Sequence, residues 1–128
     1  MIFVHTDIIP EEGTGCEMLN CPKDVMQVAR SYPDLCFVIA HCGRWCEATR
    51  VGIAKVDNVF IDTSIAPLFL IKKCLSIVGS DRVVFGSDYP YSHPRIELEK
   101  IFLLRLSDKD AESILAGNLR RLCSTHTA

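Results

Sequence analysis

The sequence predicts an α/β fold in which strands and helices alternate around a parallel sheet. Short continuous apolar runs recur along the chain, as expected for strands buried on both faces. Helix signals separate these runs, for example Pro67 at a start and Gly79 just past an end. Three of the apolar runs finish in an ionisable residue, namely His5, His41 and Asp88. Because parallel strands present their carboxyl ends at one edge, we expect these side chains to lie together.

The first half of the chain begins with a predicted short strand over residues 1–5 and a long loop over residues 6–21, which is rich in Pro and Gly. A helix is predicted over residues 22–30, since proline is tolerated in a first helical turn. Residues 35–40 form a continuous apolar strand, and a weak helix is predicted over residues 45–54.

The second half contains two further strands and three helices, which we expect at residues 59–64, 67–78, 83–87, 94–104 and 107–115. Ser107 and Asp110 have the spacing of a capping box at the start of the last of these helices. Gly117 and Asn118 are expected to break that helix, so that a separate final turn ends near Cys123. Strands alternating with helices in this way require right-handed crossovers between parallel strands.

The composition fits one soluble globular domain over residues 1–128, because 48% of the residues are apolar and 23% are charged. The net charge is −2 without a block of like charges, which argues against nucleic acid and anionic membrane as partners. The apolar runs are too short to span a bilayer, and no basic segment precedes an apolar one as in a secretory signal.

The seven cysteines indicate a reducing compartment, because their number is odd and some lie in apolar surroundings. We therefore expect a cytoplasmic protein with free thiols. The pairs Cys16/Cys21 and Cys42/Cys46 are spaced more loosely than zinc knuckles, which favours ordinary core or loop residues over a zinc cage.

Each candidate site residue also has a structural explanation. A single His at a strand end is more often a satisfied structural residue than a ligand or a proton carrier. Asp88 follows a Gly-Ser turn at the end of an apolar strand, where a carboxylate needs a partner or a cation unless it caps a turn. The expected convergence at one edge favours function, and suggests a metal hydrolase. For residues 62–64 a hydrogen-bonded strand exit is the simpler explanation, and for His93 a solvated loop.

Several motifs occur in an order that resembles a known family. They are His5-Thr6, Tyr32-Pro33-Asp34, Ala40-His41-Cys42-Gly43, Asn58 to Ser64, Phe85-Gly86-Ser87-Asp88-Tyr89-Pro90 and Ile114 to Asn118. This order resembles the amidohydrolase-related, metal-dependent TIM-barrel hydrolases, in particular the branch that contains aminocarboxymuconate-semialdehyde decarboxylase. The resemblance implies a parallel (β/α) half-barrel that corresponds to strands 5–8 of a TIM barrel.

The resemblance also implies roles for the three strand-end residues. His5 and Asp88 would bind a divalent metal, for which zinc is the first choice. Asp88 would also act as the base, and His41 would be a catalytic residue that stabilises developing negative charge. The substrate would be a small molecule with a carbonyl or carboxylate group, and the reaction a hydrolysis or a decarboxylation.

A complete barrel of this kind takes about 250 residues, and no two histidines here are spaced as His-x-His. We therefore expect either a homo-oligomer that closes a barrel from two copies or a missing N-terminal half-barrel, the chain then being truncated. The alternative function is a non-catalytic half-barrel remnant that serves assembly or binding. A doubly wound binding domain of the flavodoxin type fits the element order but does not explain the ionisable strand ends.

Overall fold

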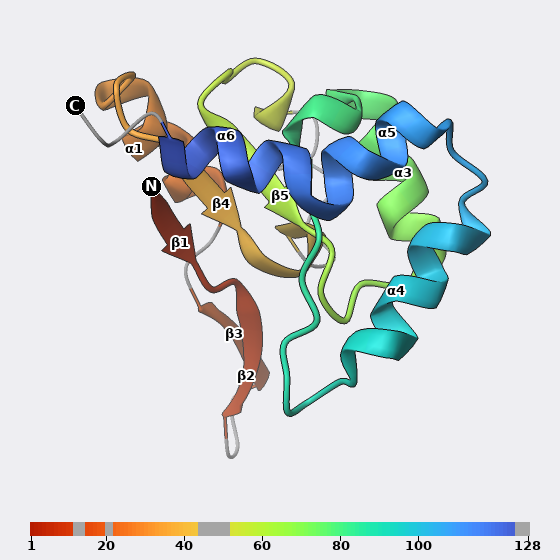
Figure 1. Cartoon of the computed structure of the whole chain (residues 1–128). Coiled ribbons are helices and arrows are strands. Elements are labelled where there is room, and N and C mark those ends of the chain that lie inside the picture. Colours follow the sequence, from red (N-terminus) through yellow and green to blue (C-terminus); the bar gives the residue numbers. More distant parts are fainter. Residues whose placement is uncertain (12–14, 20–21, 44–51, 125–128) are drawn as a thin grey trace.

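A four-stranded parallel sheet lies at the centre of the fold (Figure 1). The computed structural model describes residues 1–11, 15–19, 22–43 and 52–124, with the backbone alone for 7–11 and 15–19. The strands are ordered β1-β4-β5-β6, and their bounds are Ile2–Val4, Phe37–Ile39, Val59–Asp62 and Val83–Val84. All three strand pairs are parallel, which confirms the predicted sheet.

Helices cover one face of this sheet and form the main core. They are α1 (Pro22–Ser31), α3 (Leu68–Val78) and α4 (Pro94–Leu103), close to the predicted ranges. Pro67 precedes α3, and Gly79 ends it with φ 73° while its N–H donates to Leu75 O. Only a residue without Cβ adopts this backbone conformation without cost, which explains why the helix ends there. The predicted helix over residues 45–54 lies mostly outside the described residues.

The predicted loop over residues 6–21 is wrong, because this segment contains an antiparallel hairpin. Its strands are β2 (Asp7–Glu11) and β3 (Gly15–Leu19), and Asp7 pairs with Leu19 at the open end. Pro10 argued against a strand, yet it is tolerated because both strands of a two-stranded ribbon are edge strands. Pairing of the two strands, which the local Pro and Gly signals do not reveal, decides the structure of this segment.

The predicted break at Gly117-Asn118 is also wrong. The chain continues from α5 (Asp108–Glu112) through a π-helical turn (Ser113–Gly117) into α6 (Asn118–Ser124). The buried Asn118 side chain donates to Ser80 O and Val83 O, both at 2.7 Å. These bonds tie the helical run to β6 and to the 3₁₀ turn before it (Ser80–Arg82). The π turn accommodates the extra residue without ending the helix.

Helix α6 lies across the other face of the sheet, which we call the inner face (Figure 1). Leu122 packs there against Val38, Phe60 and Val84. Alternate residues of each strand therefore face two different layers. The rest of this inner face, toward the carboxyl ends of the strands, is left to the pocket described below.

Four cysteines belong to the described residues that carry side chains, and all four are free thiols: Cys36, Cys42, Cys74 and Cys123. No helix among the residues described is long and apolar enough to cross a membrane. The domain extent of 1–128 and the cytoplasmic location stay predictions.

Candidate active site

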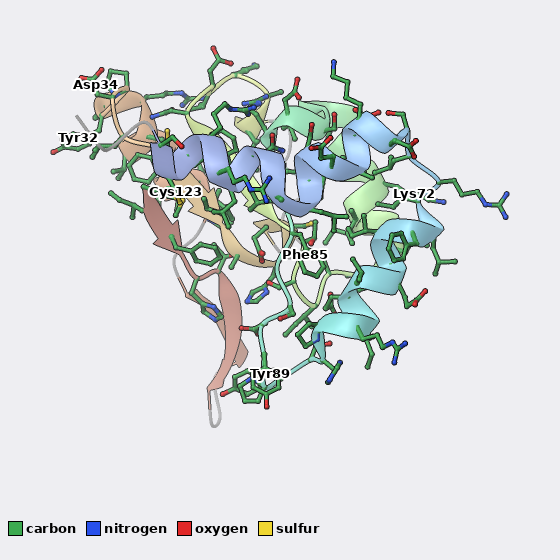
Figure 2. All side chains as sticks on the ribbon, in the orientation of Figure 1. Tyr32, Asp34, Lys72, Phe85, Tyr89 and Cys123 are labelled. Atoms are coloured by element: carbon green, nitrogen blue, oxygen red, sulfur yellow. The ribbon has the colours of Figure 1, made fainter. Side chains whose placement is uncertain are left out.

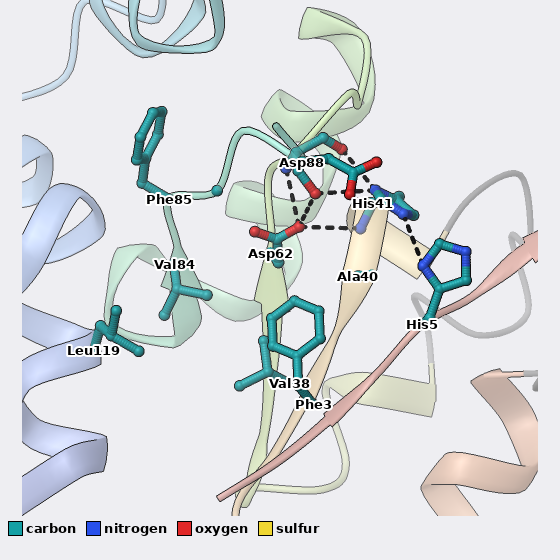
Figure 3. A pocket seen from close by; sticks show the side chains of 12 residues that line it. Phe3, His5, Val38, Ala40, His41, Asp62, Val84, Phe85, Asp88 and Leu119 are labelled. Carbon is teal, nitrogen blue, oxygen red and sulfur yellow. Dashed lines mark hydrogen bonds between the residues drawn. The ribbon is translucent and has the colours of Figure 1, made fainter. Parts of the chain in front are cut away.

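A pocket of about 210 Å³ opens on the inner face of the sheet at the carboxyl ends of its strands (Figure 3). Its floor is apolar and includes Phe3, Val38 and Leu119. Its polar groups come from four different strand ends and are His5, His41, Asp62, Ser64 and Asp88. The structure thus brings the three predicted site residues to one concavity.

Strand register explains why these side chains share a face. Phe3 is paired with Val38, and Val38 with Phe60, so all three face inward. Side chains alternate along a strand, and the residue two positions later faces the same way. His5 follows Phe3, and Asp62 follows Phe60, by two residues. Both therefore point into the pocket, from the two strands that flank β4.

His41 lies in a 3₁₀ turn (Ala40–Gly43) directly after β4, with a left-handed backbone at φ 56°. This conformation costs a non-glycine residue about 1 kcal/mol or more and must be held by its surroundings. The buried Asp62 carboxylate supplies one such contact, because its Oδ1 accepts the His41 backbone N–H at 3.3 Å. The unusual backbone turns the ring across the strand end toward Ser64 and His5.

The rings of His5 and His41 meet edge to face, with centroids 4.9 Å apart and planes at 86° (Figure 3). His41 Nε2 lies 3.3 Å from His5 Nδ1. On its other side, His41 Nδ1 contacts Ser64 O at 3.1 Å and Ser64 Oγ at 2.9 Å. The two imidazoles can therefore share a proton across the mouth of the pocket.

Asp88 also has a left-handed backbone, with φ 57°, and lines the same pocket. It is half-buried in the segment between β6 and α4, where its carbonyl accepts the Tyr91 N–H at 2.8 Å. Two residues at such a conformation in one pocket are typical of functional sites. The carboxylate can bind a cation or take a proton there.

A catalytic zinc site has three protein ligands and a fourth position for water or substrate. Within the described residues, no group of three or more His, Cys, Asp or Glu side chains is close enough to hold a metal ion. His5 and Asp88 are donors of a suitable kind, yet the described part of the chain provides an incomplete set. No chemical step can therefore be assigned to a metal held by these residues alone.

Asp62 and Ser64 are functional candidates that the sequence reasoning treated as an ordinary strand exit. Ser64 donates both its N–H, at 3.1 Å, and its hydroxyl to Asp62 Oδ1. Burial raises the pKa of Asp62 above its ordinary value, although hydrogen bonds from Ser64 and His41 act in the opposite direction. A signal was available, because Asp62 ends a strand at the same edge as the other polar strand ends.

The remaining candidates do not line the pocket. His93 is exposed and caps α4, since its Nδ1 accepts the Arg95 N–H at 3.2 Å. Tyr89 is 72% exposed at the far end of its loop (Figure 2), and Trp45 lies outside the described residues.

A hydrogen bond with Cys74, together with burial, raises the pKa of the Cys42 thiol well above its ordinary value of 9.0. That thiol is therefore no nucleophile at neutral pH.

The sequence matches the family model described as "Amidohydrolase" over residues 19–122. The chain therefore belongs to the amidohydrolase family, which agrees with the resemblance in its motifs. No match was found among curated proteins.

Solved structures share the fold at low sequence identity. An amidohydrolase from Burkholderia multivorans with bound zinc has a TM-score of 0.69 and 19% identity over 80% of this chain and 49% of its own. A dihydroxybenzoic acid decarboxylase from a Polaromonas species, with manganese and 2-nitroresorcinol, has a TM-score of 0.65 and 16% identity over 84% of this chain and 40% of its own. The 5-carboxyvanillate decarboxylase from Sphingomonas paucimobilis has a TM-score of 0.63 and 17% identity over 78% of this chain and 38% of its own. The chain thus spans half or less of the length of these relatives.

Proposed function

We propose that this chain forms strands 5–8 of an amidohydrolase barrel and supplies half of the active site of a metal-dependent hydrolase or decarboxylase. The observation that carries the proposal is that His5, His41 and Asp88 line one pocket at the carboxyl ends of the strands. Active sites of barrel enzymes lie at this face. Membership of the amidohydrolase family supports the reaction class.

In this proposal His5 and Asp88 are two ligands of a divalent metal, and residues outside the described set complete the centre. Such a metal acidifies water and polarises a carbonyl group when it is bound. Zinc and manganese are the candidates, because structures with this fold contain one or the other. His41 and Asp88 are the groups of this chain that move protons beside the substrate.

The proposed substrate is a small molecule with a carbonyl or carboxylate group. A pocket of about 210 Å³ is smaller than the roughly 300–1,000 Å³ of drug-sized ligand sites. Two structural relatives are decarboxylases of aromatic acids, namely dihydroxybenzoic acid and 5-carboxyvanillate, which supports decarboxylation as one of the two reactions. The apolar floor formed by Phe3 and Leu119 suits the ring of such an acid.

The missing wall of the pocket is proposed to come from a second half-barrel. Phe3 is 57% exposed on the inner face, and β1 is an edge strand of the sheet. Unpaired edges invite pairing with another chain. Either a twofold dimer of this chain or a separate N-terminal half would cover both features.

Metal content and mass of the purified protein test this proposal together. We expect a complex larger than one chain that retains about one zinc or manganese ion per barrel. Asp88→Asn and His5→Ala should lose that ion, whereas His93→Ala, a change at an exposed helix cap, should retain it. A metal-free monomer, whose stability is unchanged by Asp88→Asn, would instead support the alternative that the chain is a non-catalytic remnant. The lack of a three-ligand group within the described residues is the observation that favours that alternative.

A further inference from the structure

The environment of the His41 ring determines which of its nitrogens carries a proton. His41 Nδ1 lies 3.1 Å from the backbone carbonyl oxygen of Ser64. A carbonyl oxygen only accepts hydrogen bonds, so the neutral ring must present N–H to it. The side chain of His41 is buried, at 3% exposure, and cannot exchange this partner for bulk water.

The Ser64 hydroxyl imposes the same choice. It lies 2.9 Å from His41 Nδ1 and also contacts Asp62 Oδ1. Asp62 Oδ1 accepts the single hydroxyl proton, so Oγ offers a lone pair to the ring. Two acceptors therefore face Nδ1, and the neutral ring keeps its one basic lone pair on Nε2.

Asp62 holds this arrangement in place from both sides. Its Oδ1 accepts the N–H of Ser64, the hydroxyl of Ser64 and the backbone N–H of His41. One carboxylate oxygen thus anchors both the residue that orients the ring and the left-handed backbone that carries it. A group that fixes the tautomer of an active-site histidine acts through that histidine rather than on the substrate.

We infer that Asp62 and Ser64 are positioning residues that hold His41 as its Nδ1–H tautomer and leave Nε2 as the acceptor atom of the pocket. This inference deepens the proposed function and relies on it only for the catalytic meaning of Nε2. It also changes the role of His41. With Nδ1 protonated, Nε2 accepts a hydrogen bond from His5, from water or from substrate, and the neutral ring offers no positive charge to a developing anion.

The tautomer can be observed directly by ¹H–¹⁵N NMR of the histidine rings in ¹⁵N-labelled full-length protein, at a pH where the rings are neutral. His41→Asn assigns the His41 signals. We expect the pattern of the Nδ1–H tautomer for His41. His93 is the internal control, because its Nδ1 accepts the Arg95 N–H and its proton should sit on Nε2. An Nε2–H pattern for His41, or the averaged pattern of an unrestrained ring, would overturn the inference.

Variants separate positioning from general stability. Ser64→Ala should speed exchange of the Nδ1 proton by about tenfold, the effect expected for one lost hydrogen bond. Ser64→Thr restores the hydroxyl and should restore slow exchange. Thr63→Val is the matched control, because it removes the neighbouring buried hydroxyl, whose described partner is Gly86 rather than His41. Unchanged exchange in Ser64→Ala would contradict the role of Ser64.

Asp62 is tested with two substitutions. Asp62→Asn keeps an oxygen at Oδ1 and should keep the tautomer, whereas Asp62→Ala should give a mixture of both tautomers. A tautomer unaffected by Asp62→Ala would contradict the role of Asp62. If Asp62→Ala does not fold, the wild-type spectrum and Ser64→Ala still decide the question. None of these spectra needs metal or turnover, so a protein that binds no metal could still show the predicted tautomer.

Discussion

Gly86 lies against Asp62 so closely that a Cβ on Gly86 would stand 1.8 Å from Asp62 Oδ2. No side-chain atom fits at that distance, so any larger residue at position 86 must displace the carboxylate. The displacement would also disturb the contacts of Asp62 with His41 and Ser64. The glycine of the Gly-Ser-Asp segment therefore makes room for a charge on the neighbouring strand.

Gly86→Ala is expected to destabilise the protein by about 1–3 kcal/mol, the usual cost of overpacking a filled site. Urea unfolding monitored by circular dichroism measures the change. Gly117→Ala is the matched control, because a Cβ there would meet its nearest atom at an ordinary 3.5 Å. That change should be neutral or slightly stabilising, since alanine is the better helix former. A stable Gly86→Ala protein with an unchanged His41 ring spectrum would refute the tight contact.

The stability of the protein should depend on pH through Asp62. Burial raises its folded-state pKa above the ordinary value of 3.8, so the folded protein binds its proton more readily than the unfolded chain. Stability then falls as the pH rises from that ordinary value through the folded-state pKa. Asp62→Asn lacks this group, so the difference in unfolding free energy between the two proteins should shift in favour of Asp62→Asn over that range. A difference independent of pH would contradict the prediction.

Ser107→Ala should lower stability by about 1 kcal/mol, because Ser107 Oγ caps α5 by accepting the Asp110 N–H at 3.2 Å. Separately, hydrogen bonds from Ser107 and Ser80 to the Asp110 carboxylate lower the pKa of Asp110. The stabilisation from these two bonds is present above pH 3.8 and is lost as the pH falls through the lowered pKa. Thermal melts at neutral and acid pH measure both effects. We expect Ser107→Thr, which keeps a capping oxygen, to lose much less.

Glu97 joins the segment after β5 to the segment before α4. Its buried carboxylate forms an ion pair with Lys100 and accepts the Ile65 N–H at 3.1 Å and the Ser92 hydroxyl at 2.8 Å. Glu97→Gln removes the charge but keeps the shape, and should cost about 1–3 kcal/mol. Glu99→Gln, an exposed change on the same helix, should have no measurable effect in the same urea titration. Equal stability of the two variants would mean that the network contributes nothing.

The sequence predicted most of the sheet and its covering helices because their boundaries are encoded locally. Pro67 and Gly79 mark the two ends of α3, and Ser107 marks the start of α5. The hairpin was missed because Pro10 reads locally as a breaker, whereas pairing of the two strands decides the outcome. Gly117 predicts a break, because the tertiary hydrogen bonds of Asn118, which favour a continuous helix, are invisible in the sequence.

The placement of His5, His41 and Asp88 around one pocket could be predicted from a simple rule, since parallel strands end at one edge. The direction of the His41 ring could not. It depends on a left-handed backbone and on a carboxylate 21 residues further along the chain. Contacts of that kind arise only when the strands are assembled, so Asp62 and Ser64 were assigned no more than a structural part.

The hydrogen bonds between the β6 segment and the helical residues 113–124 have a consequence for folding during synthesis. Phe85 N–H donates to Ile114 O at 2.9 Å, and Asn118 holds the carbonyl of Val83. Leu122 fills the apolar cluster on the inner face. A nascent chain on the ribosome therefore exposes this cluster until residues 113–124 have emerged. We expect chaperones to engage the chain during that interval, because its strands are present before their cover.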